Sequence, residues 1–189
     1  MYEPLESARY SLESTADGLR VSIPSRRNWF VLLFLVAWLG GWYMGETSVI
    51  RELLNPKPNS ATAFLGFWLL GWTLGGAFCF GTVLWQLAGR EVLIASASTL
   101  VHRIEVFGIG RSRAYKASDI KNLRAADYSR NPATNQKAWY PPFGSAGDGP
   151  IAFDYGARTI RVAQALEEAE AKALIGELTE RLPRTAWEA

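Results

Sequence analysis

Two long stretches without a charged residue limit what this chain can fold into. The first, 28–45, reads NWFVLLFLVAWLGGWYMG, and the second covers 61–89. A helix needs roughly 17–25 mostly apolar residues to cross a bilayer, so each stretch is long enough. Two buried helices of a soluble protein are the alternative, but neither stretch has a polar face at helical spacing. We therefore predict a transmembrane hairpin over 28–89, with helices at 28–45 and 61–89 and a short external loop at 46–60.

A cleaved signal peptide is a second interpretation of the first stretch. However, 27 mostly polar residues precede it, and Gly40-Gly41-Trp42 does not resemble a small-residue cleavage site. We expect it to remain as a membrane anchor. Cys79 in the second stretch is expected to be a packing residue rather than a reactive thiol.

The basic residues indicate the orientation of the hairpin. Arg20, Arg26 and Arg27 precede the first helix and Arg90 and Arg103 follow the second, whereas the connecting loop has only Arg51 and Lys57, offset by Glu46 and Glu52. Because Lys and Arg favour the cytoplasmic side, we predict that both termini are cytoplasmic.

The two stretches share the pattern F-L-x-x-W-L-x-G-W, at 34–42 and at 64–72. Each also contains a G-x-x-x-G motif, formed by Gly41 with Gly45 and by Gly71 with Gly75. Since small residues let helices approach closely in lipid, these glycines are predicted to pack helix against helix, within the hairpin or in a larger assembly; chance similarity is the alternative. The absence of ionisable residues from both stretches argues against transport.

The remaining sequence is typical of β-structure. Alternating apolar residues around Ala16-Asp17-Gly18 predict a hairpin over 10–23, within a cytoplasmic segment 1–27. Further strands are predicted at 91–94, at 99–107 and 111–117 (joined through 108–110), and at 120–128, 151–155 and 158–162. Apolar residues at helical spacing then predict an amphipathic helix over 164–181.

This layout, with EVLIASASTLVHRIEVFGIGRSRAYKASDI directly after the second apolar stretch, resembles the small bacterial membrane proteins that carry a pleckstrin-homology-like (PH-like) domain. The resemblance implies a β-rich barrel or sandwich over 90–184, closed by the C-terminal helix. It also implies a bacterial inner-membrane location and membrane-tethered binding or scaffolding, with no catalytic residues to carry over. The closing helix lacks the Trp that is usual in the eukaryotic fold. The hairpin at 10–23 is expected to complete the same barrel, so that the membrane helices are an insertion between its strands.

Arg103, Arg111 and Arg113 have a spacing similar to the basic residues with which some PH domains hold phosphoinositide headgroups. Arg suits phosphate oxygens, so we predict an anion or lipid-headgroup site here. A solvated strand face, with ion pairs to Glu105 or Asp119, is the competing interpretation.

A Pro- and Gly-rich loop at 129–150 contains Trp139, Tyr140 and Phe143. A loop of this length is often functional, and the three aromatic residues are predicted to contact a partner or the membrane interface, or to pack on the β domain.

Other functions lack a signal. One Cys and one His exclude a multi-His metal site, and a net charge of +2 is not typical of nucleic-acid binding. No nucleotide or hydrolase motif occurs, so no enzyme activity, cofactor or metal is expected. We predict a membrane-anchored, non-catalytic binding or scaffold protein that recruits a protein or an anionic lipid. A structural subunit or assembly factor of a larger membrane complex, or a homo-oligomer formed through the helices, is the alternative.

Overall fold

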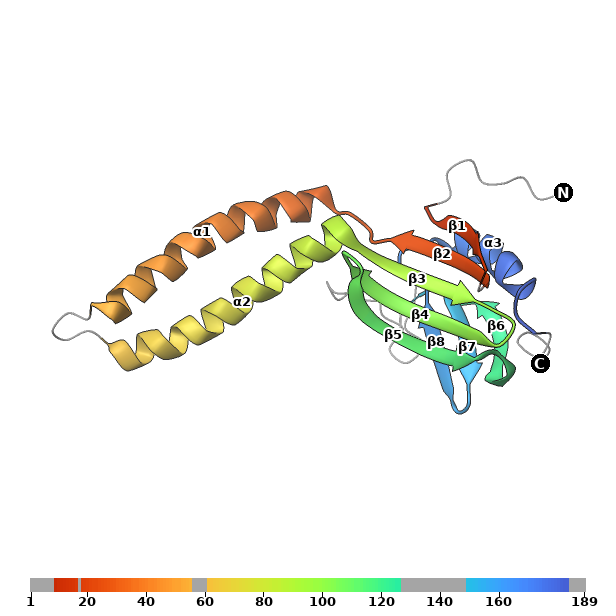
Figure 1. Cartoon of the computed structure of the whole chain (residues 1–189). Helices are drawn as coiled ribbons and strands as arrows, with labels where there is room; N and C mark the ends of the chain where they lie inside the picture. Colours follow the sequence, from red (N-terminus) through yellow and green to blue (C-terminus); the bar gives the residue numbers. More distant parts are fainter. Residues whose placement is uncertain (1–8, 17, 56–60, 127–148, 184–189) are drawn as a thin grey trace. The chain divides into compact units, whose positions relative to one another are not determined.

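The computed structural model describes residues 9–16, 18–55, 61–126 and 149–183. The chain divides into two compact units. Residues 1–26 and 88–189 form one unit, which we call the β domain, and residues 27–87 form the other, the helical hairpin (Figure 1).

Five antiparallel strands of the β domain form one sheet, which we call sheet A, in the order β1-β2-β3-β4-β5. They are β1 (Ser11–Thr15), β2 (Gly18–Pro24), β3 (Gly89–Ala95), β4 (Thr99–Val106) and β5 (Ile109–Lys116). The predicted N-terminal hairpin is confirmed, because β1 pairs with β2 up to Thr15 and Gly18. Gly18 has a φ of 135°, a conformation that L side chains rarely adopt.

Strand pairing in sheet A bridges the helical hairpin. β2 ends at Pro24 and β3 begins at Gly89, yet the two strands pair from Leu19 opposite Ala95 to Pro24 opposite Arg90. Beyond the last pair, the Ser25 amide donates a hydrogen bond to the Gly89 carbonyl at 3.0 Å. The helical hairpin is therefore inserted between two neighbouring strands of one continuous sheet.

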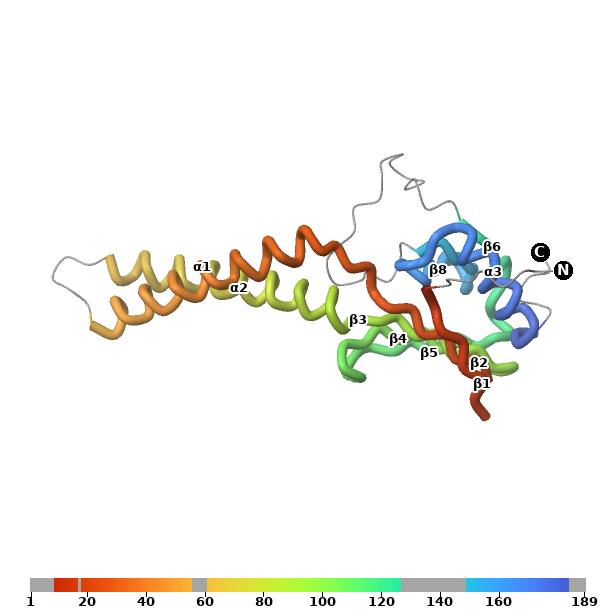
Figure 2. The backbone as a smooth tube through the Cα atoms, turned by 90° about the horizontal axis from the view of Figure 1, so that it is seen from above, coloured from red at the N-terminus to blue at the C-terminus, as the bar shows by residue number. Residues whose placement is uncertain are grey.

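A second sheet, sheet B, follows a short 3₁₀ turn at Ala117–Asp119. It consists of β6 (Ile120–Ala125), β7 (Ile151–Tyr155) and β8 (Arg158–Val162), in that order, and is followed by α3 (Glu168–Thr179). In the part of the chain that the structure describes, no strand pairs across the two sheets, so the barrel expected as one possibility is not closed. One core cluster takes side chains from both sheets and from α3, with Leu93, Phe153 and Leu174 fully buried. Figure 2 shows β6, β8 and α3 as a second layer beside sheet A.

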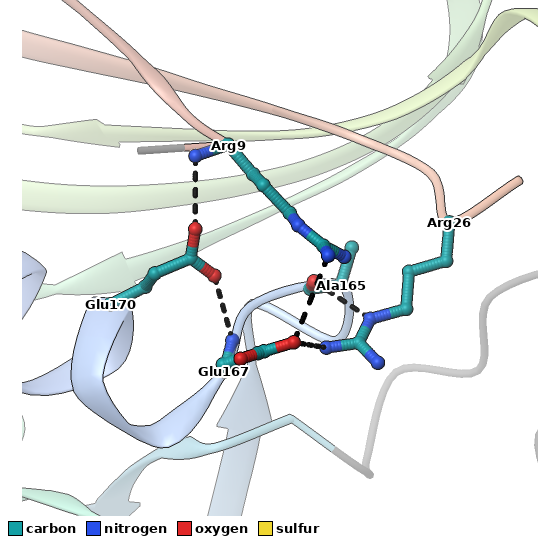
Figure 3. A network of polar contacts seen from close by, with 5 residues as sticks. All are labelled: Arg9, Arg26, Ala165, Glu167 and Glu170. Carbon is teal, nitrogen blue, oxygen red and sulfur yellow. Dashed lines mark hydrogen bonds and ion pairs between the residues drawn. The ribbon is translucent and has the colours of Figure 1, made fainter. Parts of the chain in front are cut away.

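The start of α3 is joined to the ends of the β1–β2 hairpin (Figure 3). The Glu170 carboxylate accepts hydrogen bonds from the Arg9 and Glu167 backbone amides, both at 2.9 Å. The Glu167 carboxylate contacts the guanidinium groups of Arg9 at 3.7 Å and Arg26 at 3.4 Å, and Arg26 also donates to the Ala165 carbonyl. Glu167 and Glu170 form a capping box, and this cap starts the helix at Glu168 rather than at 164 as predicted.

The helical hairpin contains α1 (Trp29–Leu54) and α2 (Thr62–Ala88). Both are long and apolar enough to cross a membrane, by length and composition alone. The prediction that the first helix ends at residue 45 is wrong, because α1 continues to Leu54 through polar residues. A helix is held by backbone hydrogen bonds and can continue without apolar side chains. The Thr47 and Ser48 hydroxyl groups donate hydrogen bonds to carbonyls of the preceding turn.

The two helices contact each other through equivalent residues of the shared sequence pattern. The Trp42 indole donates to the Trp72 carbonyl at 3.0 Å, and the Trp72 indole donates to the Trp42 carbonyl at 3.5 Å. The Trp38 ring of α1 also lies against the Trp72 ring, with ring centroids 5.8 Å apart. The Trp42 ring also lies over Gly76, where an added Cβ would be 2.0 Å from the ring. The paired indoles and Gly76 therefore form the contact between the two helices.

Gly76→Ala tests this contact between the helices, with a change at the neighbouring Gly75 as the comparison. The new methyl group must displace the Trp42 ring and break its hydrogen bond, at a cost of about 1–3 kcal/mol, as is usual for overpacking. Gly75→Ala is the matched control, because an added Cβ there meets nothing within 4 Å. We expect Gly76→Ala alone to lower the unfolding temperature of the purified protein. Equal effects of both changes would contradict the packing of Trp42 on Gly76.

Candidate functional site

The β4–β5 hairpin carries the residues that the sequence singled out. Its two strands pair in continuous register, with His102 opposite Arg113, Arg103 opposite Ser112 and Ile104 opposite Arg111. Residues directly opposite each other in a sheet share a face. Arg111 and Arg113 therefore lie on one face of sheet A, with His102 and Ile104, and Arg103 lies on the other.

The three arginines predicted to form one anion site therefore do not share a face of the sheet. Arg103 is also engaged, because its Nε lies 2.6 Å from the Glu105 carboxylate and its Nη2 donates to the Gly108 carbonyl. Glu105 is only 2% exposed, and the Arg90 guanidinium binds its other oxygen. Arg103 therefore neutralises a buried carboxylate and braces the β4–β5 turn. The competing interpretation, an ion pair with Glu105, holds for Arg103.

Arg111 and Arg113 have a different environment. Both are exposed, and within the described residues neither has a hydrogen bond or an ion pair. On the same face of β5, Tyr115 is buried, where its ring meets Phe153 and Tyr155 of β7 edge-on, each with centroids 5.2 Å apart. Sheet B thus covers the Tyr115 end of this face and leaves the end with the two arginines uncovered by described residues.

β5 is also an edge strand. It is the last strand of sheet A, and no described strand pairs with its outer side (Figure 1). Such an edge offers unpaired backbone N–H and C=O groups to an added strand. The edge and the two arginines, together with the exposed Lys116, form a surface that we call the β5 edge. It suits an extended segment that carries negative charge.

A buried polar cluster behind Arg113 was not predicted from the sequence. Glu91, which is 7% exposed, accepts hydrogen bonds from the Ala163 amide at 2.7 Å and the Gln164 amide at 2.9 Å. His102 Nε2 lies 2.7 Å from the same carboxylate, at an angle outside the range of a hydrogen bond. Ala163 has a φ of 68°, which turns both amides toward Glu91. Glu91 therefore ties β3 of sheet A to the end of β8 of sheet B. Glu91 and Gln164 are 73 residues apart, so no local pattern signals this contact.

A second polar cluster lies on sheet B. Asp154 accepts hydrogen bonds from Thr159 at 2.7 Å, from Arg124 at 3.1 Å and from Asn122 at 3.1 Å. These donors, Thr159 first, lower the pKa of the Asp154 carboxyl. Both oxygens of Asp154 accept hydrogen bonds within the cluster, which is the pattern of a structural ion pair rather than a binding site.

The four glycines predicted to pack helix against helix are not used alike. A Cβ added at Gly45 would lie 3.5 Å from the Trp72 ring. A Cβ added at Gly41, Gly71 or Gly75 would meet nothing within 4 Å. Within this chain, therefore, those three glycines do not pack between the helices. Gly76 fills that role, and its position outside the G-x-x-x-G motif concealed it.

Trp139, Tyr140 and Phe143 lie outside the described residues. Among the residues that are described, no three His, Cys, Asp or Glu side chains gather as metal ligands would. Comparison of the chain with protein-family models, with curated proteins and with solved structures finds no match.

Glu91→Ala tests the junction between the sheets. Removal of the carboxylate leaves the buried Ala163 amide and the partly buried Gln164 amide without an acceptor, which costs about 1–3 kcal/mol for a fully buried group. We expect lower stability and faster hydrogen exchange of a peptide that covers 160–166, measured by mass spectrometry. Glu13→Ala on the exposed strand β1 is the control and should change neither; unchanged exchange in Glu91→Ala would contradict the proposed tie.

Proposed function

We propose that this chain is a membrane-anchored, non-catalytic binding protein that recruits a partner protein through the β5 edge at the cytoplasmic face of a bacterial inner membrane. The observation that carries the proposal is the β5 edge itself, an exposed edge strand whose two arginines have no described partner. A buried acid already engages Arg103, which speaks against a headgroup site formed by all three arginines. A protein segment with acidic residues therefore fits better than the anionic lipid that the sequence also suggested.

The helical hairpin supports the membrane anchor. Its large apolar side chains are exposed rather than buried in a core, with Phe30 at 82% and Phe67 at 78%. Exposed apolar surface of this extent is unfavourable in water and favourable in lipid. With two membrane crossings the two termini lie on the same side, and the basic residues next to the helices favour the cytoplasm.

The PH-like resemblance is part of the same proposal. Two antiparallel sheets that share a core with one C-terminal helix are consistent with it, although sheet A draws two of its strands from before the membrane helices. A domain of this kind, held at a membrane, suits recruitment rather than chemistry.

A subunit role in a larger membrane complex is the second candidate. The open sides of Gly41, Gly71 and Gly75 favour it, because small residues without a neighbour in the same chain leave room for a helix from another.

Site-specific photo-crosslinking in the full-length protein separates these functions. A photoreactive residue in place of Ser112 on the β5 edge should give a discrete adduct with one protein. Arg111→Glu with Arg113→Glu should reduce its yield about tenfold, since loss of roughly 1.4 kcal/mol of binding energy is a tenfold change. Arg158→Glu, an exposed arginine on sheet B, should leave the yield unchanged.

Each other outcome overturns the proposal. Adducts with lipid alone would restore the headgroup hypothesis. Adducts only from a photoreactive residue at Gly71 would favour the subunit role. An adduct from position 112 whose yield does not change when Arg111 and Arg113 are replaced by Glu would show that the β5 edge is not the recruiting surface.

A further inference from the structure

The turn between β4 and β5 has an apolar tip. Phe107 is 75% exposed and Ile109 is 83% exposed. Among the described residues of the β domain the next most exposed large apolar side chain, Leu12, reaches only 43%. Two adjacent side chains of this kind are unfavourable in water, so their exposure needs a reason.

The turn conformation does not favour a phenylalanine at this position. Phe107 has a φ of 52° and Gly108 a φ of 81°, the pattern of a two-residue turn with both φ values positive. Asn, Asp or Gly favour the first position of such a turn, and a bulky side chain is disfavoured there. The contact of Arg103 with the Gly108 carbonyl holds the turn nevertheless. A strained aromatic residue at an exposed tip points to a use of its side chain.

The register of sheet A places the tip at a defined level. Val106 lies opposite both Gly89 of β3 and Ile109 of β5. Gly89 is the first residue of β3, directly after α2 ends at Ala88. The turn is therefore level with the residue at which the chain leaves the second apolar helix.

A basic residue follows the apolar tip. Arg111 is exposed and lies two residues beyond Ile109 on β5, without a described partner. Apolar side chains backed by Arg or Lys are typical of segments that insert into the interface of a bilayer, where the charge meets anionic headgroups.

We propose that Phe107 and Ile109 insert into the interface of the bilayer that α2 crosses, with Arg111 at the level of the headgroups. This inference rests on the proposed membrane anchor. The tip then gives the β domain a third contact with the membrane, besides the two chain links to the helices. Arg111 then serves the headgroups, and Arg113 with the unpaired side of β5 is left for the partner.

Spin-label accessibility in the reconstituted full-length protein tests the insertion. Cys79→Ala removes the only native thiol, and single cysteines are then introduced as Ile109→Cys at the tip, Ala97→Cys in the β3–β4 turn at the other end of the sheet, and Leu74→Cys in α2. The vesicles contain phosphatidylcholine with or without phosphatidylglycerol. We expect the label at 109 to collide more with oxygen than with a water-soluble nickel chelate, as lipid-exposed labels do, and the label at 97 to show the reverse.

Two variants sharpen the test. Phe107→Asp should return the label at 109 to the pattern of water, and Arg111→Gln should remove any deepening caused by phosphatidylglycerol. A label at 109 that matches the label at 97, while the label at 74 reports lipid, would overturn the inference and leave the membrane anchor intact. A label at 74 that reports water would overturn the anchor and the inference together.

Discussion

The rest of the architecture depends on one strand pairing, that of β2 with β3. The chain leaves sheet A at Pro24 and returns at Gly89, and the hydrogen bond from Ser25 to Gly89 closes the gap at this point. The segment between these two strands must therefore have its first and last residues close together. Two antiparallel helices of similar length meet that condition. The pairing therefore requires an even number of membrane crossings and brings a domain made from both ends of the chain to one side of the proposed bilayer.

Buried carboxylates then fix the parts of the β domain to each other. Glu91 joins sheet A to the end of β8, Glu105 holds Arg90 and Arg103, and Glu170 joins the chain before β1 to the start of α3. An ionised side chain is costly to bury unless charged or N–H groups surround it, and each of these acids has such partners. On the β4–β5 hairpin, Arg103 has such an acid, whereas the described residues provide none for Arg111 and Arg113.

The sequence predicted the elements better than the contacts. Apart from their ends, apolar length and alternation located the helices and the strands of the described residues, because burial leaves a local period in the sequence. The turn between β4 and β5 decides which of the three arginines share a face. A loop at 108–110 would place Arg103 opposite Tyr115 and on the face of Arg111, whereas the observed two-residue turn at Phe107-Gly108 shifts the register by an odd number and moves Arg103 to the other face. Long-range contacts such as Glu91 with Gln164 leave no period at all, so no local pattern could predict them.

Side-specific labelling shows directly whether the helices cross a membrane with the β domain on the cytoplasmic side. Single cysteines introduced as Leu54→Cys at the end of α1 and Ala97→Cys in the β domain, in the Cys79→Ala background, are treated with a membrane-impermeant maleimide in intact bacteria that express the full chain. We expect the cysteine at 54 to react in intact cells and the cysteine at 97 to react only after the membrane is permeabilised. Reaction of both in intact cells, or of neither until permeabilisation, would contradict it.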